Sequence, residues 1–541
     1  MGNIPHNSSA RKIVQSELDI TSDKKHVGNW VLAATILGTG MALIDSTAMN
    51  VVLPVLQLEF NTSITTVQWI VEAYALLLAS LMLLGGSLGD HFGRRRIFAL
   101  GVVVFTVASI WCGIAADVNH LIIARIFQGI GGALLVPGSL AIINVFFKVE
   151  QRGRAIGAWS GFTAITTALG PVLGGWLVDN LSWRYVFFIN VPIAVIVLCI
   201  LFFGVPESRN KEGSGKLDLL GALLVTIGLG GIVFGLIESY GRGFNNTLVL
   251  GSMIFGVLVL IAFIIFEGYV SAPMMPLNLF HSRNFSGANL VTFLLYGAFG
   301  GSLFFIPFNL IQVQGYSATS AGAAFLPSIL IISLFSHQAG AMIGRYGAKI
   351  SLMIGPTIVA LGYLMFAIPG IGGSYWSTFF PAVVTLGFGM AISIAPLTTT
   401  VMSAVEEQHS GVASGINNST ARVAGLLSIA VLGIIILHTF NSSLDSRLDS
   451  LQIPPEARQI IDEQNMKLAA IELPHNLSGE LKDALHESIG ESFHASFRII
   501  MLITSGLALG SALIAWLTIK DPTTRPKLVT KDSNITPLDR V

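Results

Sequence analysis

The chain has 541 residues, of which 53% are hydrophobic and only 11% are charged, and its formal net charge is zero. A soluble globular domain carries roughly 25% charged residues, so this composition excludes a soluble protein and predicts a polytopic membrane protein. The zero net charge also excludes the basic stripe that is typical of nucleic-acid binding.

The chain begins with a polar segment and continues with apolar runs. Residues 1–28 lack the apolar core of a cleavable signal peptide, and we interpret them as a cytoplasmic tail. A membrane-crossing helix needs about 20 mostly apolar residues, and fourteen runs satisfy this condition. The predicted helices cover 29–53, 67–88, 97–116, 121–146, 155–178, 183–204, 217–238, 248–270, 285–312, 319–343, 350–370, 376–402, 411–438 and 496–518.

Basic residues in the short loops predict the orientation of these helices. If the N-terminus is cytoplasmic, most loop Lys and Arg residues lie on the cytoplasmic side, and the C-terminal tail, 519–541, adds five more. One cytoplasmic loop, around Glu406 and Glu407, has no basic residue. The pattern favours a cell-membrane protein with both termini in the cytoplasm. The basic loop residues on that side are Arg94, Arg95, Arg96, Lys148, Arg152, Arg154, Arg209, Lys211, Lys216, Arg283, Arg345 and Lys349.

The one long loop, 439–495, falls on the extracytoplasmic side. It has mixed charge and two helix-like pieces, which begin near Pro455 and Ser478. Two roles stay open for this loop, a solvated cap and a substrate gate.

A glycine-rich motif occurs twice. Gly86-x-x-x-Asp90-x-x-Gly93-Arg94-Arg95 returns in the second half as GAMIGRYGAK (340–349), which lacks the Asp. Both copies follow the second helix of their half. This arrangement predicts two six-helix bundles in the same orientation, a plan known from transporters. The bundles would cover 29–204 and 285–518, with two inserted helices in 217–270.

Four motifs in order resemble those of a known family. They are LIDSTAMNVVLP (43–54), GGSLGDHFGRRR (85–96), RIFQGIGGALLVPG (125–138) and ALGPVLGG (168–175). Over residues 29–520 the chain resembles the fourteen-helix drug:proton antiporters of the major facilitator superfamily. The resemblance implies an all-α fold in which two six-helix bundles, plus two inserted helices, rock about a central cavity. That cavity opens alternately to each side.

The first of the repeated motifs is a candidate gate. Glycines let helices and loop approach closely, and an aspartate can pair with a base or a helix N-terminus. The resemblance implies that this cluster latches the two halves in the outward-facing state. Topology anchoring by the arginines is the alternative. The gating residues are Gly86, Asp90, Gly93, Arg94 and Arg95.

Asp45 lies two-thirds along the first predicted helix, among apolar neighbours. A lone charge in mid-bilayer costs about 2.5–3.5 kcal/mol and by default marks a functional site. A carboxyl that gains and loses a proton as its surroundings alternate is what proton coupling needs, and the resemblance implies this role. The alternative is a packing aspartate that is hydrogen-bonded to Ser46 or Asn50.

Three further charged residues interrupt apolar helices. Arg125 resembles the helix-four arginine of the family's proton relay, with a structural ion pair as the alternative; Gln128, at i+3, shares its face. Glu72, three residues after Trp69, could pair with a base, bind a cation or reach the outer interface. For Arg422 a structural and a functional role both stay open.

The fifth predicted helix contains Gly170-Pro171-x-x-Gly174-Gly175. Pro removes a backbone donor, and the glycines permit close helix contact. The resemblance identifies this stretch as the antiporter motif, which favours exchange over uptake. Ordinary small-residue packing is the alternative.

The ninth predicted helix is rich in Phe and weakly polar residues. Such a lining suits an amphipathic or lipophilic molecule, although these side chains could instead face lipid. The candidate residues of a substrate cavity are Gln128, Phe305, Asn309, Gln312 and Arg422.

Other functions lack their motifs. EGSGKL (212–217) does not have the spacing of a phosphate loop, QGIGG (128–132) lies within a helix, and no His/Cys/Glu spacing suggests a metal. We therefore expect no enzyme activity and no cofactor, with protons as the coupling ion. The predicted function is proton-coupled efflux of small hydrophobic or cationic compounds by a monomer. The alternatives are a dedicated exporter of one lipid, metabolite or siderophore, and a transport-inactive membrane sensor.

Overall fold

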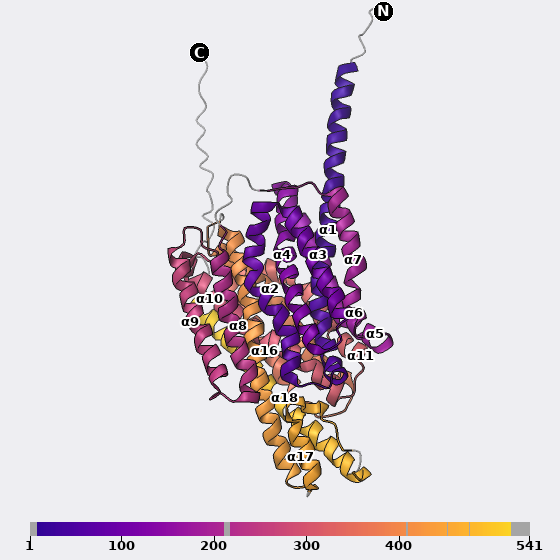
Figure 1. Ribbon diagram of the computed structural model, residues 1–541. Coiled ribbons are helices and arrows are strands. Elements are labelled where there is room, and N and C mark those ends of the chain that lie inside the picture. Colours follow the sequence, from indigo (N-terminus) through magenta and orange to yellow (C-terminus); the bar gives the residue numbers. More distant parts are fainter. Residues whose placement is uncertain (1–7, 210–216, 407–408, 452, 475–476, 521–541) are drawn as a thin grey trace, which may run out of the picture.

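The computed structural model describes residues 8–209, 217–406, 409–451, 453–474 and 477–520, and every element in these ranges is helical (Figure 1). Fourteen of the helical segments are long and apolar enough to cross a membrane, as predicted. The elements of the first half are α1 (Ser8–Glu59), α2 (Ile64–Phe92), α3 (Arg94–Gly113), α4 (Val118–Phe146), α5 (Val149–Asn180), α6 (Tyr185–Phe188) and α7 (Asn190–Gly204).

Two helices, α8 (Leu219–Arg242) and α9 (Thr247–Tyr269), separate the first half from the second. The elements of the second half are η1 (Leu277–His281), α10 (Arg283–Phe308), η2 (Asn309–Val313), α11 (Ala318–Ala323), α12 (Leu326–Tyr346), α13 (Ala348–Phe366), α14 (Tyr375–Thr378), α15 (Phe380–Ser403), α16 (Ser410–Leu448), α17 (Pro455–Glu463), η4 (Asn465–Ala470) and α18 (Gly479–Thr518).

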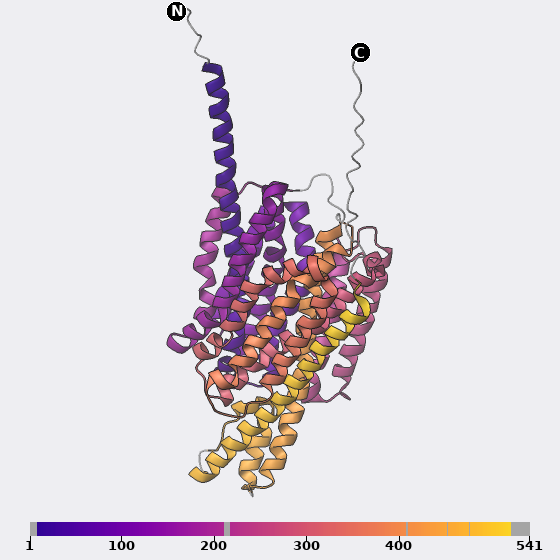
Figure 2. The ribbon, with the colours of Figure 1, turned by 180° about the vertical axis from the view of Figure 1, so that it is seen from behind.

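The two ends of the molecule differ. α1 begins and α18 ends at one end, which we name the termini end, and α17 lies at the other, the cap end (Figures 1 and 2). Of the predicted N-terminal tail, 1–28, residues 8–28 instead continue α1 as a helix, and residues 1–7 lie outside the described ranges. The predicted C-terminal tail lies outside them from residue 521 onwards.

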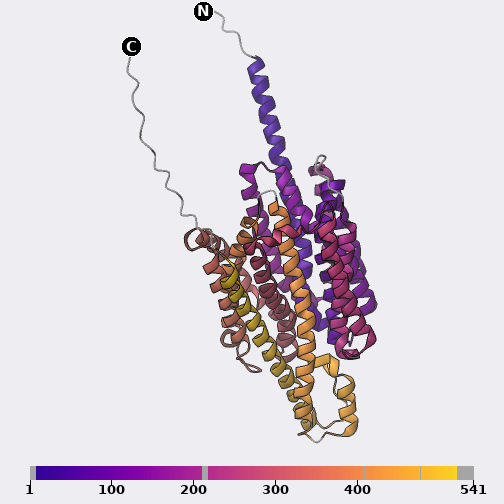
Figure 3. The same ribbon diagram turned by 90° about the vertical axis from the view of Figure 1, so that its left-hand side faces the viewer.

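The stretch 439–495, predicted as a loop, is largely helical. α16 continues to Leu448 and α18 begins at Gly479, so both spanning helices project beyond the bundle (Figure 3). The sequence correctly placed the helix starts at Pro455 and after Ser478. The projecting segments stay helical because Leu444 and Leu485 are buried in the continuous apolar core. We name the described residues of 439–495 the cap.

Small residues bring the helices of the first half together. A Cβ built on Gly131 of α4 would lie 2.5 Å from the backbone N of Phe105 on α3, and one built on Gly85 of α2 would overlap the carbonyl of Ala133 on α4. Only glycine permits backbones to approach this closely. The contact fixes α4 against α2 and α3, at the depth where the polar residues of the first half lie.

The inserted helices connect the two halves. α8 packs on α9, and it also lies against α2 of the first half and α16 of the second. A buried apolar cluster joins Leu76 of α2, Val233 of α8 and Leu426 of α16. α8 therefore covers one side of the seam between the halves.

The seam on the other side runs between α5 and the pair α11 and α12. A Cβ on Gly175 of α5 would overlap the carbonyl of Ala318, and one on Gly322 would overlap that of Pro171. Towards the termini end, a Cβ on Gly157 or Gly161 meets no described neighbour within 4 Å. This seam is therefore tightly packed at the cap end, and no described residue packs against these two glycines towards the termini end.

Candidate functional site

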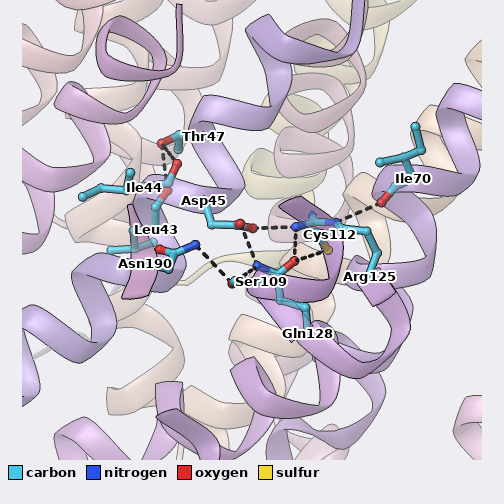
Figure 4. A network of polar contacts seen from close by, with 10 residues as sticks. All are labelled: Leu43, Ile44, Asp45, Thr47, Ile70, Ser109, Cys112, Arg125, Gln128 and Asn190. Atoms are coloured by element: carbon cyan, nitrogen blue, oxygen red, sulfur yellow. Dashed lines mark hydrogen bonds and ion pairs between the residues drawn. The ribbon is translucent and has the colours of Figure 1, made fainter. Parts of the chain in front are cut away.

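The charged residues of α1 and α4 meet in the middle of the first half (Figure 4). Arg125 donates from Nη1 to Asp45 Oδ2 at 2.6 Å and to Gln128 Oε1 at 2.7 Å. Gln128 donates from Nε2 to Asp45 Oδ1 at 2.7 Å. The three side chains close a ring, and Asp45 and Arg125 are 0% and 1% exposed.

Two more helices extend this ring. Gln128 Nε2 also donates to Ser109 Oγ on α3 at 2.9 Å, and Asn190 Nδ2 on α7 donates to the same hydroxyl at 3.2 Å (Figure 4). Arg125 Nε donates to the carbonyl of Ile70 on α2 at 3.1 Å. We name Asp45, Ser109, Arg125, Gln128 and Asn190 the polar network.

The polar network accounts for two charges in an apolar interior. Burying an ion is costly unless a counter-ion and hydrogen bonds compensate it, and here each charge has both. The guanidinium of Arg125 also lies 4.2 Å from the ring centroid of Tyr74, in cation–π geometry. Within the described chain the hydrogen bonds to Asp45 come from α4, and Ser46 and Asn50, considered from the sequence, donate none of them.

Sequence reasoning missed Ser109, Asn190 and Tyr74. Their only signal was a polar group inside an apolar helix, which many packing residues share. The shared face of Arg125 and Gln128 on α4 was predicted from their i+3 spacing, and the structure brings both to Asp45.

Glu72 is different, because its carboxyl group is wholly buried and neither oxygen has a hydrogen-bond partner in the described residues. One turn before it, Gln68 donates to the carbonyl of Ile429 on α16 at 2.9 Å. One turn after it, Leu76 packs against α8 and α16. Residues one turn apart share a helix face, so Glu72 faces the seam of α2, α8 and α16. The reach to the outer interface considered from the sequence is not observed.

Arg422 lies on α16, one turn before Leu426, and interacts electrostatically with Tyr74 of α2. The hydroxyl of Tyr74 has no hydrogen-bond partner in the described chain. Tyr74 thus interacts with two guanidinium groups, that of Arg125 in the first half and that of Arg422 in the second.

The gating motif makes its bonds within the first half. Arg94 Nε donates to Asp90 Oδ1 at 2.8 Å, and the carboxylate of Glu207, after α7, accepts from the backbone N of Arg95 and Arg96. Gly93 has φ +113°, a conformation that favours glycine. Among the described residues, no bond from this motif reaches the second half.

The predicted close approach at Gly86 lies instead at its neighbour Gly85. A Cβ on Gly86 would have an ordinary contact of 3.7 Å with Pro137, whereas one on Gly85 would overlap α4. Sequence reasoning also missed Glu207, because a carboxylate in a loop gives no signal of its own.

The antiporter motif packs α5 on two sides. A Cβ on Gly174 would lie 2.7 Å from Ala48 Cβ, and one on Gly170 would overlap Thr47, both on α1. Gly175 and Pro171 face α11 in the second half. The motif is therefore a seam of small residues in this conformation.

The candidate substrate residues do not form one cavity. Phe305 and Asn309 are buried in the second half, Gln128 belongs to the polar network, and Arg422 faces Tyr74. Gln312 lies at the cap end, where its Nε2 donates to Gln57 Oε1 of α1 at 2.9 Å. It also lines a cavity of about 820 Å³, together with the cap residues Arg447, Glu491 and His494 and with Arg498 of α18.

Comparisons with known proteins agree with this architecture. The model of the Major Facilitator Superfamily matches residues 35–429. The tetracenomycin C resistance and export protein of Streptomyces glaucescens is 30% identical over 497 residues, 90% of this chain and 91% of that protein. The multidrug resistance protein Stp of Mycobacterium tuberculosis is 32% identical over 438 residues, 80% of each chain.

A solved structure shows the same fold. The bacterial homolog of the human lysosomal transporter Spinster, in an inward-facing and unoccupied conformation, has a TM-score of 0.62 and 19% identity. The match covers 92% of this chain and 99% of that chain.

Proposed function

This chain belongs to the Major Facilitator Superfamily, and on that premise we propose that it exports small hydrophobic or cationic compounds in exchange for protons. It is a multi-pass membrane protein with fourteen membrane-spanning helices. Relatives that share most of its length are resistance and export proteins, among them a multidrug resistance protein, which supports efflux. The transported compound is the only chemical partner that this function requires besides protons.

We place the chain in the cell membrane with the termini end in the cytoplasm. The basic residues Arg94, Arg95 and Arg96 form the first turn of α3 at the termini end, directly after the turn at Gly93, and clusters of basic residues next to a membrane-spanning helix are retained on the cytoplasmic side. The cap is then extracytoplasmic. The tight packing of the seam at the cap end and the lack of close neighbours at Gly157 and Gly161 support a conformation that opens towards the cytoplasm, from which an exporter takes up its substrate.

The ring of Asp45, Arg125 and Gln128 is the observation that carries the coupling proposal. A proton on Asp45 removes the negative charge that compensates Arg125. A buried charge left alone costs about 3–5 kcal/mol, so Arg125 then has to find another counter-charge or hydration. Proton binding at Asp45 is thereby linked to a rearrangement of α1 against α4.

Glu72 supplies a second proton-binding group in this proposal. Its carboxyl is buried without a partner, and an uncompensated carboxylate in an apolar interior is very costly. In this conformation the group is therefore held as the neutral acid. It releases its proton when the seam of α2, α8 and α16 admits water or a cationic substrate.

The test uses purified protein in liposomes with an imposed pH gradient and a pH-sensitive dye inside. Lipophilic cations such as ethidium are added to wild type, to Asp45→Asn and to the control Asp117→Asn. Asp117 is an exposed residue that caps α4, and Asn caps helices equally well. We expect substrate-induced proton flux in wild type and in the control, and at least about tenfold less in Asp45→Asn.

Two results would overturn parts of the proposal. Equal flux in wild type and Asp45→Asn would move the coupling to Glu72. No flux with any compound would contradict broad proton-coupled efflux and favour a narrow exporter or a sensor.

A further inference from the structure

We propose that Asp179, at the cap end of α5, is the positioning residue that holds the two halves closed on the extracytoplasmic side. Its carboxylate crosses the seam to α11. Oδ1 accepts from the backbone N of Ala318 at 3.1 Å, and Oδ2 accepts from the backbone N of Thr319 at 2.8 Å and from Thr319 Oγ1 at 2.5 Å. One side chain of the first half thus receives three hydrogen bonds from the second half.

These bonds lie at the end of the closely packed part of the seam. α5 and α11 lie side by side (Figure 1), and Gly175 and Gly322 bring their backbones together. Packing of small residues is close but not directional, because it has no charge or lone pair to satisfy. Hydrogen bonds to a charged acceptor are stronger and fix the register of the two segments.

In this proposal the contact is specific to the conformation described. The face of α5 that carries Pro171 and Gly175 continues towards the termini end through Gly161 and Gly157. At those two glycines no described residue of a neighbouring element lies within 4 Å of a built Cβ. Rigid-body rocking that closed the seam at the termini end would separate α5 from α11 at the cap end and break the bonds to Asp179.

Asp90, the carboxylate of the gating motif at the termini end, makes its hydrogen bond on one side of the seam. Asp90 is hydrogen-bonded to Arg94, four residues away on its own side of the seam. Within the described residues, Asp179 bonds across the seam and Asp90 does not. We infer that loss of its carboxylate shifts the equilibrium towards the form that is open at the cap end.

This inference rests on the proposed transport function and on the alternating opening that the family resemblance implies, but its test needs neither substrate nor protons. Spin labels at Leu181→Cys and Trp376→Cys, in a background with Cys112 and Cys199 replaced by Ala, report the distance between the halves at the cap end. Both labelled positions are exposed. Asp179→Ala removes all three acceptor contacts. Asn180→Ala is the matched control, because in the described part of the chain the Asn180 side chain bonds only to the carbonyl of Trp176 within α5.

We expect the ratio of short to long distances to fall about three- to tenfold in Asp179→Ala and to stay unchanged in Asn180→Ala. Thr319→Val, which removes one of the three bonds, should give a smaller shift in the same direction, and it keeps the test decisive if Asp179→Ala does not fold. Unchanged distances in Asp179→Ala or in Thr319→Val, or an equal shift in the control, would overturn the proposal. Absence of proton flux in liposomes with the expected distance shifts would contradict the transport proposal and leave this one standing.

Discussion

Asp45 and Glu72 lie on the first two membrane-spanning helices, and both side chains are 0% exposed. Asp45 accepts hydrogen bonds from Arg125 and Gln128, whereas neither oxygen of Glu72 has a partner in the described chain. The same chemical group is therefore part of a compensated ion pair in one region and an isolated acid in the other. The fold depends on the charge of Asp45 and not on that of Glu72, so substitutions should affect stability and transport differently at the two sites.

Arg125→Leu should have the largest effect on stability. It leaves Asp45 as a buried charge without a counter-ion, which costs about 3–5 kcal/mol of unfolding free energy. Thermal unfolding of the purified protein measures this loss. The double variant with Asp45→Asn should recover most of it, because neither charge is then left alone. If the double variant is as unstable as Arg125→Leu, the instability does not come from the unpaired charge of Asp45.

Gln128→Met should have a smaller effect in the same region. Met has a similar length, but Asp45 loses a donor at 2.7 Å and Arg125 loses an acceptor at 2.7 Å. Hydrogen bonds to charged groups contribute about 1.5–3 kcal/mol, so the unfolding free energy should fall by about that amount. If Gln128→Met unfolds at the same temperature as wild type, water has taken over the hydrogen bonds of the Gln128 amide.

Asp117 provides a third, solvent-exposed carboxylate for the comparison. The backbone N–H of His120 donates to it at 3.0 Å, and this bond lowers the pKa of the Asp117 carboxyl. A lowered pKa in the folded state gives stability that is present above the unfolded value, about 3.9, and is lost as the pH falls through the folded value. Asp117→Ala should unfold at a slightly lower temperature than wild type at pH 7. The difference should shrink in acid, and a constant difference at both pH values would contradict this cause.

Glu72→Gln should have the smallest effect on stability, within about 0.5 kcal/mol of wild type, because the Glu72 carboxyl has no hydrogen bond among the described residues to lose. A loss of unfolding free energy as large as that of Arg125→Leu would reveal a partner for the Glu72 carboxylate and would contradict the contrast between Asp45 and Glu72.

The sequence indicated parts of this site for identifiable reasons. Apolar runs of spanning length predicted the fourteen helices, and a charge inside such a run marked Asp45, Arg125 and Glu72 one by one. The partner of Asp45 could not be predicted, because α1 and α4 meet only in the tertiary structure. The alternative, in which Ser46 or Asn50 bonds to Asp45, is not observed among the described residues.

In the cap, sequence reasoning predicted less regular structure than is observed. Its polar composition predicted a loop, although Leu444, Leu448, Leu485 and Ile489 lie at helical spacing and are buried. A stripe this narrow on a mostly polar helix is a weak signal, and packing of α16 against α18 gives it stability. Asp179 escaped notice for a related reason, since an exposed acid at a helix end is common.

The most direct test of proton coupling compares two activities of the same liposomes. Equilibrium exchange of labelled ethidium without a gradient measures substrate movement alone, and substrate-induced proton flux under a pH gradient measures coupling. In Asp45→Asn and Glu72→Gln we predict that exchange persists, within about threefold of wild type, while proton flux falls at least about tenfold. Wild-type proton flux in both variants, or equal loss of exchange and flux in both, would contradict the claim that these two buried carboxylates carry the protons.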